Sequence, residues 1–252
     1  MAVPRRILPT DEGEGVSEPR SVLITGANQG IGASMAARFL ALGDKVSTIY
    51  HSGQDPAPGV LGIVGDVTDT QTVEDAFKTI EAQNGPVEVL VANAGITRDQ
   101  LLMRMTDADF ETVVSVNLGG AFKCVRRASK GMIRMRKGRI ILIGSVVGLM
   151  GNPGQVNYSS SKAALVGMAR SLTHELGSRG ITANVIAPGF IDTAMTAALP
   201  QEVQDTYKSR IPAGRFAQTD EVAGVVEFLA SADAGYISGA VIPVDGGLGM
   251  GH

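Results

Sequence analysis

Residues 21–32 read "SVLITGANQGIG", and this stretch decides the fold. An apolar, β-branched run over 21–25 passes directly into a glycine-rich segment and then into an alanine-rich one. A strand followed by a glycine-rich turn and a helix is the pattern of a βα unit. Glycine permits a positive φ and leaves backbone N–H groups uncovered, so the turn could hold a phosphate at the N-terminus of the helix.

The same alternation of short β-branched runs and longer helical runs continues to the C-terminus. Several of the runs lack polar/apolar alternation, as expected for strands covered on both faces. The pattern predicts a Rossmann-type α/β fold, a doubly wound seven-stranded parallel sheet with helices on both faces. The predicted strands span 21–25, 45–49, 60–64, 87–92, 139–144, 181–187 and 240–244. The predicted helices span 30–42, 70–83, 106–136, 157–178 and 219–231.

Length and composition fit a single domain. The chain has 252 residues, 44% of them hydrophobic, and a formal net charge of −3. We expect a flexible arm over 1–20, rich in Pro, Gly and charge, and one domain over 21–252. The near-neutral charge argues against nucleic acid as a partner, and no apolar run reaches the roughly 18 residues of a membrane span. The lone cysteine, Cys124, suits a reducing, cytoplasmic compartment, and no metal site is expected.

The turns that follow the strands carry the candidate ligand site, because open parallel sheets bind ligands beyond the carboxyl ends of their strands. Gly26, Gly30 and Gly32 are spaced to cradle a pyrophosphate. Asp66, after the third strand, could accept a hydrogen bond from an adenine amino group. The small residues of "ANAG", 92–95, would let a ribose or adenine lie near the backbone. Each feature alone also occurs in ordinary turns. Together they predict a dinucleotide-binding groove.

The end of the second strand bears on the choice of coenzyme. Here the chain reads "IYHSG", 49–53, with no carboxylate before Asp55. A carboxylate at this place would bind the 2′-OH of NAD, whereas His51 and Ser52 could donate to a 2′-phosphate. We therefore expect NADPH (NADP+) as the cofactor. The candidate cofactor-binding residues of these turns are Gly26, Asn28, Gln29, Gly30, Ile31, Gly32, His51, Asp66, Val67, Asn93, Ala94 and Gly95.

The segment "NYSSSK", 157–162, places Tyr158 and Lys162 one helical turn apart on the same face of a helix. An ammonium near a phenol favours the phenolate, so we expect Lys162 to lower the pKa of Tyr158 from about 10. Such a phenol can give a proton to a carbonyl oxygen, or take one from an alcohol. The alternative for a lone Y-x-x-x-K is an incidental pair on a helix surface.

Two further residues support the catalytic interpretation. Ser145 ends the fifth strand, and its hydroxyl could bond a substrate oxygen on which charge develops. Asn117 lies inside a predicted helix, and its amide could hold a water that links Lys162 to solvent. A hydrolase mechanism at Ser145 is disfavoured, because a G-x-S-x-G elbow is missing and no histidine follows a strand in a triad arrangement.

Together, "TGANQGIG", "NAG", Asn117, Ser145 and "YSSSK" resemble the short-chain dehydrogenase/reductase family over about 21–252. The resemblance implies that Tyr158 is the proton donor, that Lys162 binds the nicotinamide ribose, and that both are also cofactor-binding residues. It also implies that Ser145 positions the carbonyl and that Asn117 supports a proton relay.

The segment "APGFIDTAM", 187–195, is similar to the stretch of this family that covers the nicotinamide. By this resemblance Ile191 would bond the carboxamide through its backbone, and Thr193 would add a hydroxyl. Pro188 and Gly189 complete the implied contacts of this segment with the cofactor.

A narrower resemblance joins "NAGITRDQLLMRMTDADF" and "GRIILIGSVVGLMGNPGQVNY" to bacterial 3-oxoacyl-[acyl-carrier-protein] reductases, with a C-terminal ending similar to actinobacterial ones. It implies reduction of an acyl-carrier-protein thioester in type II fatty-acid synthesis, by a homotetramer whose Arg136 and Arg179 dock the carrier. Two solvated helix-end cations are the alternative for these arginines. Gln29 and His51 depart from the family, standing where related reductases carry arginines for the 2′-phosphate.

Two other functions stay open from the sequence. A reductase of acetoacetyl-CoA or of another small ketone would use the same residues. A dinucleotide-sensing module that has lost catalysis would need only the groove, and the intact set of Asn117, Ser145, Tyr158 and Lys162 argues against it.

Overall fold

The seven predicted strands form one all-parallel sheet in the order β3-β2-β1-β4-β5-β6-β7. The computed structural model describes residues 18–197 and 200–250. The strand order reverses between β1 and β4, which is the switch point where such sheets bind ligands. The predicted fold class is thus confirmed. The strands are β1 (Ser21–Ile24), β2 (Lys45–Tyr50), β3 (Leu61–Val64), β4 (Val89–Ala92), β5 (Gly138–Ile143), β6 (Ile181–Pro188) and β7 (Val241–Val244).

Burial along the strands explains their composition. Every residue of β1, β4 and β6 is buried, since helices cover both faces of the central sheet. The edge strand β7 is half-exposed and contains Pro243, whose missing N–H would interrupt a central strand.

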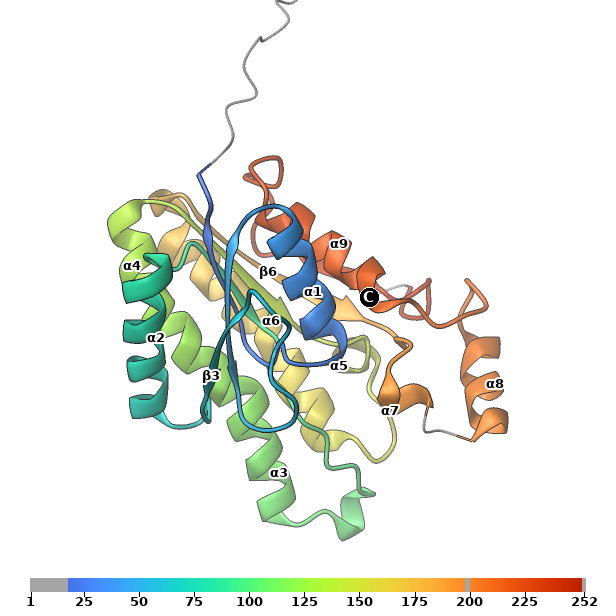
Figure 1. Ribbon diagram of the computed structural model, residues 1–252. Coiled ribbons are helices and arrows are strands. Elements are labelled where there is room, and N and C mark those ends of the chain that lie inside the picture. Colours follow the sequence, from blue (N-terminus) through green and yellow to red (C-terminus); the bar gives the residue numbers. More distant parts are fainter. Residues whose placement is uncertain (1–17, 198–199, 251–252) are drawn as a thin grey trace, which may run out of the picture.

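The helices form two layers (Figure 1). Phe77, Cys124 and Leu165 pack from α2, α4 and α6 on one face, while Met35 and Val222 pack from α1 and α9 on the other. The bounds of these helices agree with the predicted ranges except on α4. They are α1 (Gly30–Ala41), α2 (Thr70–Asn84), α4 (Ala121–Met135), α6 (Val156–Leu176) and α9 (Thr219–Ala230).

The prediction of one continuous helix over 106–136 is wrong in one respect. A π-helical turn, η2 (Ser115–Gly120), separates α3 (Asp107–Val114) from α4. The turn contains Gly120, where a Cβ would lie 2.5 Å from Val67 Cγ2, so the helix passes very close to the β3 end. Single π turns are frequent at functional sites, and this one carries Asn117.

Five elements were missed by the sequence: four have only three or four residues, too few to show a helical period, and α8 buries none of its residues and so has no apolar stripe. They are η1 (Leu102–Arg104), α5 (Val147–Met150), η3 (Gly177–Arg179), α7 (Ala194–Ala197) and α8 (Gln201–Arg210). Two of these, α7 and α8, lie on the side of the molecule opposite to α2 and α4, at the right in Figure 1.

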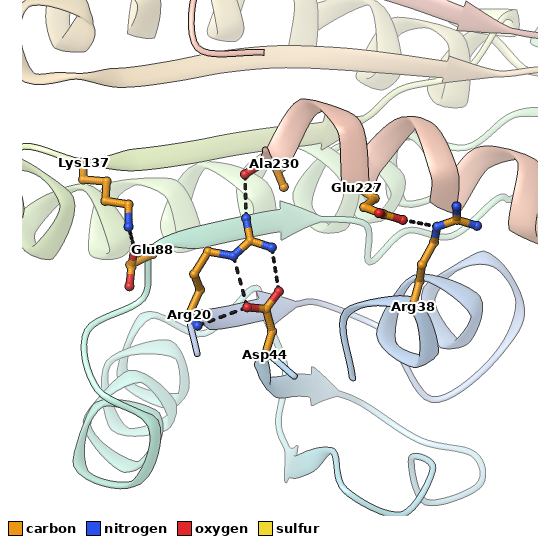
Figure 2. A network of polar contacts seen from close by, with 7 residues as sticks. All are labelled: Arg20, Arg38, Asp44, Glu88, Lys137, Glu227 and Ala230. Carbon is orange, nitrogen blue, oxygen red and sulfur yellow. Dashed lines mark hydrogen bonds and ion pairs between the residues drawn. The ribbon is translucent and has the colours of Figure 1, made fainter. Parts of the chain in front are cut away.

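Ion pairs close the amino ends of the strands (Figure 2). Arg20 binds Asp44 through two side-chain hydrogen bonds and donates a third to Ala230 O. Lys137 pairs with Glu88 at the start of β4 and β5. Arg20 thus belongs to the fold although the sequence assigned it to the arm, and the rest of the predicted arm lies largely outside the described residues.

Candidate active site

The turn after β1 is joined to the end of β4 by hydrogen bonds from both sides. Thr25 Oγ1 accepts from the N–H groups of Asn93 and Ala94 at 3.0 and 2.9 Å. Asn93 Nδ2 donates in return to the carbonyls of Thr25 and Gly26, at 2.9 and 3.2 Å. The two strand ends on either side of the switch point are therefore held as one rigid unit.

Three glycines shape this turn, for two different reasons. Gly26 and Gly30 have φ of 68° and 55°, the left-handed region that favours glycine. At Gly32 a Cβ would lie 2.3 Å from the Gly26 carbonyl oxygen, so any side chain is excluded by packing. The Gln29 side chain does not cap α1, and the first turn of that helix contains no acidic residue. The N-terminal N–H groups, including those of Ile31 and Gly32, suit an anion.

The ends of β2 and β3 border the same turn. Asn28 Nδ2 donates to Ser52 O and Gln54 O at 2.9 and 3.2 Å, which joins the glycine turn to the segment after β2. His51 is exposed beside it. The nearest acid in sequence, Asp55, accepts a hydrogen bond from Tyr50 Oη at 2.7 Å.

Asp66 and Val67 follow β3. One carboxylate oxygen of Asp66 accepts from Thr68 N at 2.8 Å, so it fixes its own turn. Val67 is buried against Gly120 of the π turn. The expected adenine contact of Asp66 is a prediction that this geometry permits through its second oxygen.

Tyr158 and Lys162 lie on the first turns of α6, beside Ser145. The Ser145 hydroxyl lies close enough to the Tyr158 phenol to lower the phenol pKa, so the two hydroxyls predicted to act together are neighbours. Lys162 Nζ lies 5.7 Å from the centroid of the Tyr158 ring and donates to Ile143 O at 2.7 Å. Lys162 is only 5% exposed. These contacts confirm that the pair is not an incidental one on a helix surface.

The expected lowering of the phenol pKa is not found. Burial raises the pKa of Tyr158 above its ordinary value, the Ser145 hydrogen bond lowers it in part, and the carboxylate of Asp99 raises it further. Burial also lowers the pKa of Lys162 to about 8. The sequence argument considered only the attraction between phenolate and ammonium, and it could not include the cost of desolvating each group.

Asn117 uses its amide within the protein. Oδ1 accepts from Ile96 N at 2.8 Å, and Nδ2 donates to Ile96 O and Ser161 Oγ, both at 3.1 Å. A Cβ at Gly95 would lie 3.1 Å from Asn117 Oδ1 and 3.3 Å from Lys162 Nζ, so all three residues converge. The predicted water-holding role of the amide stays a prediction, and the observed role is to join the β4 end to α6.

The segment after β6 borders the site from the other side. Ile191 pairs with Ala217 in an isolated bridge, whose hydrogen bonds run from Ala217 N to Phe190 O and from Asp192 N to Ala217 O. The Ile191 N–H takes no part in that bridge. Thr193 N donates to Thr196 Oγ1 at 2.9 Å, and Thr193 is half-buried.

Comparison with known proteins identifies the family. A family model described as "Enoyl-(Acyl carrier protein) reductase" matches residues 26–249. The 3-oxoacyl-[acyl-carrier-protein] reductase MabA of Mycobacterium tuberculosis is 53% identical over 242 residues, which cover 95% of this chain and 98% of that protein. The chain belongs to the short-chain dehydrogenase/reductase family.

Other reductases of this family are similarly close. The 3-oxoacyl-[acyl-carrier-protein] reductase FabG of Escherichia coli is 44% identical over 240 residues, or 92% of this chain and 98% of FabG. MabA of Mycobacterium avium is 51% identical over 242 residues, with coverage of 96% and 94%. The sequence resemblance to actinobacterial members is thereby confirmed.

Most of the residues through which the sequence resembles this reductase family lie at the carboxyl ends of the strands or on the helices beside them. Arg136 and Arg179 do not. They lie where β5 and β6 begin, and Arg136 Nη2 donates to Ser178 O at 3.1 Å. Tyr158 and Arg179 are separated by most of α6, whose 21 residues span about 30 Å at about 1.5 Å per residue.

Ser161 is a site residue that the sequence argument missed. It was interpreted only as a small neighbour, yet its hydroxyl donates to Tyr158 O at 2.7 Å and accepts from Asn117 Nδ2. The available signal was its position one turn from Tyr158 on the catalytic face. Within residues 18–197 and 200–250 there is no cluster of His, Cys, Asp or Glu suited to a metal, and no helix long and apolar enough to span a membrane.

Proposed function

We propose that this chain is an NADPH-dependent 3-oxoacyl-[acyl-carrier-protein] reductase, which converts the 3-keto group of a carrier-bound thioester to a 3-hydroxyl. The observation that carries the proposal is the convergence of Ser145, Tyr158 and the buried Lys162 beside the end of β4. Two hydroxyls that meet in this way suit one carbonyl oxygen. Relatives that are 44% and 53% identical are named for the same reaction.

The glycine turn after β1 supports the binding of a dinucleotide. The packing at Gly32 leaves room only for backbone, and the N–H groups that begin α1 are free of side-chain caps. Both features suit a pyrophosphate. Lys162, Ile191 and Thr193 would hold the nicotinamide half. When bound, the cofactor supplies a hydride to the carbonyl carbon.

Tyr158 supplies the proton in this mechanism. Its raised pKa keeps the phenol protonated at neutral pH, which is the state that a proton donor requires. Ser145 donates a hydrogen bond to the carbonyl oxygen as negative charge develops there, and the phenol then transfers its proton to that oxygen. One hydride and one proton together convert the ketone to the alcohol.

Lys162 stabilises the phenolate that remains. Its Nζ is buried and donates to the Ile143 carbonyl, and within the described part of the chain no carboxylate pairs with it. A pKa of about 8 leaves it mostly protonated at neutral pH. Asn117 keeps Gly95 and α6 at the distance that this arrangement needs.

The test of the mechanism is Tyr158→Phe, which removes only the hydroxyl. We expect turnover of a 3-oxoacyl thioester to fall by about 10²–10⁴-fold with cofactor affinity unchanged. The matched control is Tyr236→Phe, at a fully exposed tyrosine, which should keep wild-type turnover. Full activity of Tyr158→Phe would refute the mechanism. Tight cofactor binding without any turnover of the wild-type chain would favour the sensing module.

We propose NADPH rather than NADH as the coenzyme. The support is local: no carboxylate follows β2 directly, and Asp55 is engaged by Tyr50. His51 and Ser52 are exposed at the same place. His51→Asp should lower kcat/KM for NADPH and raise it for NADH, because a carboxylate repels a 2′-phosphate and accepts from a 2′-OH. Equal use of both coenzymes by the wild-type chain would contradict the proposal.

We propose that Arg136 and Arg179 dock the acidic carrier protein. Both are exposed and adjacent, joined through Ser178. Since Arg179, with Arg136 beside it, lies beyond the far end of α6, about 30 Å from Tyr158 of the same chain, the docked thioester would enter the site of a neighbouring subunit. Arg136→Glu with Arg179→Glu should lower kcat/KM for carrier thioesters and leave CoA thioesters unaffected. Equal rates for both substrates before and after the change would favour the small-ketone function.

We also propose a homotetramer in the cytoplasm. Large apolar side chains are exposed on two helices, with Phe122 and Ile133 on α4 and Phe228 on α9. Exposed apolar patches of this kind mark subunit contacts. Sedimentation of the chain as a monomer would contradict the assembly. The single buried cysteine, Cys124, suits a reducing compartment.

A further inference from the structure

Asn157, the residue before Tyr158, is completely buried although it is polar. It lies in the first turn of α6, where backbone N–H groups need partners outside the helix. The residue at the N-cap, Gln155, gives no side-chain cap. Asn157 Oδ1 accepts from Tyr158 N at 2.8 Å instead. Asn157 therefore fixes the backbone of the residue that carries the phenol.

The other end of the Asn157 amide reaches a different element. Nδ2 donates to Arg98 O at 2.9 Å and approaches Asp109 O at 3.4 Å. Arg98 belongs to the segment 97–105 between β4 and α3, here called loop 97–105. One buried side chain thus joins the first turn of the catalytic helix to this loop and to α3.

Two more contacts hold loop 97–105 in place. Gln100 N donates to Gly154 O at 2.8 Å, and Gln155 Nε2 donates to Asp99 Oδ2 at 2.8 Å. Both partners lie before Tyr158, on the approach to α6. Among these contacts, Asn157 alone bonds both the loop and the Tyr158 backbone.

We propose that Asn157 is a positioning residue, which sets the place of Tyr158 relative to loop 97–105 through its hydrogen bonds to Tyr158 N and Arg98 O. The role rests on the proposed function, since it needs Tyr158 as the proton donor. Ser161 restrains the same residue from the other side, by its hydrogen bond to Tyr158 O.

Loop 97–105 also affects the charge around the phenol. The charged groups that face Tyr158 are Asp99 from this loop and Lys162 from α6. Releasing the loop would weaken the effect of Asp99 and open the phenol to water. Both changes lower the pKa of Tyr158, because burial and Asp99 are what raise it.

Asn157→Ala is the first test. We expect kcat to fall by about 10- to 100-fold, since misplacing a catalytic group by about 1 Å has an effect of that size. The KM for NADPH should stay within about twofold, because the hydrogen bonds of the Asn157 side chain go to Tyr158 N, Arg98 O and Asp109 O and not to the glycine turn. The alkaline limb of the kcat/KM profile should move to lower pH.

The matched control is Asn184→Ala. Asn184 is also completely buried and also binds two backbone groups, Ile237 O at 2.8 Å and Ala240 N at 3.1 Å. It lies inside β6, away from Tyr158. We expect a similar loss of stability with wild-type kcat and pH profile. If both variants lose kcat in proportion to stability, Asn157 is merely structural and the inference is overturned.

A double variant separates positioning from general damage. If Asn157 acts through Tyr158, then Asn157→Ala added to Tyr158→Phe should reduce the residual turnover by less than about twofold. A further loss as large as that of the single variant would overturn the inference. Should Asn157→Ala not fold, Asn157→Asp retains the acceptor for Tyr158 N and loses the donor to Arg98 O, and the same outcomes apply.

The two proposals fail in different ways. Wild-type turnover in Asn157→Ala, together with an inactive Tyr158→Phe, would overturn the positioning role alone. Full turnover in Tyr158→Phe would overturn the proposed function and, with it, the role of Asn157.

Discussion

The two ends of the same sheet use charge in opposite ways. At the amino ends, Arg20 binds Asp44 and Lys137 binds Glu88, so the charges are neutralised where they lie (Figure 2). At the carboxyl ends, Lys162 is buried with a carbonyl rather than a carboxylate as its partner. Charges that are paired within the protein stabilise the fold but are not available to bind a charged ligand. A buried cation without a counter-ion is costly, and it persists where a bound group or a developing anion can use it.

At the carboxyl ends of the strands, adding a single methyl group should weaken cofactor binding. Gly32→Ala would bring a Cβ to 2.3 Å from the Gly26 carbonyl oxygen, which the rigid turn cannot relieve cheaply. We expect NADPH affinity to weaken by about 10- to 100-fold, as overpacking of a few kcal/mol implies. Fluorescence titration with NADPH measures this. The control is Gly131→Ala in α4, whose Cβ would meet atoms no nearer than 3.9 Å; equal weakening in both variants would contradict the cradle.

Breaking an ion pair at the amino ends of the strands should lower the stability of the fold and leave turnover unchanged. Asp44 is 5% exposed, and its removal would leave Arg20 without its carboxylate. Asp44→Ala should therefore lower the free energy of unfolding by about 3 kcal/mol, the usual cost of breaking a buried pair. Urea unfolding and kcat, measured on the same preparation, test both expectations. A loss of kcat in the folded variant would show that the ion pair at the amino ends also contributes to catalysis.

Burying the Lys162 ammonium without a carboxylate should lower the free energy of unfolding, and this loss should depend on pH. Its pKa is about 8 in the folded chain and 10.5 ordinarily, so the unfolded chain binds more protons between these values. The destabilisation caused by burying the ammonium is fully present below pH 8 and decreases as pH rises toward 10.5. Lys162→Met should abolish turnover, and its gain in unfolding free energy relative to wild type should be larger at pH 7 than at pH 10.

Urea unfolding at the two pH values measures this difference, and Lys78→Met on the exposed face of α2 is the control. The side chain of Lys78 is 61% exposed, and Asp75 raises its pKa rather than lowering it. Lys78→Met should therefore show no gain that fades above pH 8. If the free energy of unfolding differed between Lys162→Met and wild type by the same amount at both pH values, burial of the Lys162 charge would not be the cause.

The smallest effect should come from a pair that is exposed. Asp75 and Lys78 are 57% and 61% exposed, so solvent already screens them. Asp75→Ala should change the free energy of unfolding by less than about 1 kcal/mol. The same urea measurement serves here. A loss as large as that of Asp44→Ala would show that pairing alone, without burial, gives the amino end its stability.

Particular residues show how far sequence reasoning reached. The β-branched runs predicted all seven strands, because strands covered on both faces leave a plain apolar signal. The spacing of Tyr158 and Lys162 predicted a shared helix face, which the structure confirms. The break at Ser115–Gly120 escaped prediction, since the helical period does not signal a π turn and the close approach of Gly120 to Val67 joins distant segments.

By itself, the sequence determined the order of strands and helices, the glycine turn and the types of residue at each strand end. These follow from local conformational preference and from the period of apolar residues. Only the tertiary structure decided that burial raises the pKa of Tyr158, that Asn117 and Ser161 meet, and that Arg136 and Arg179 lie at the far end. Desolvation and contacts between distant segments depend on what surrounds a side chain, and those surroundings exist only after the chain has folded.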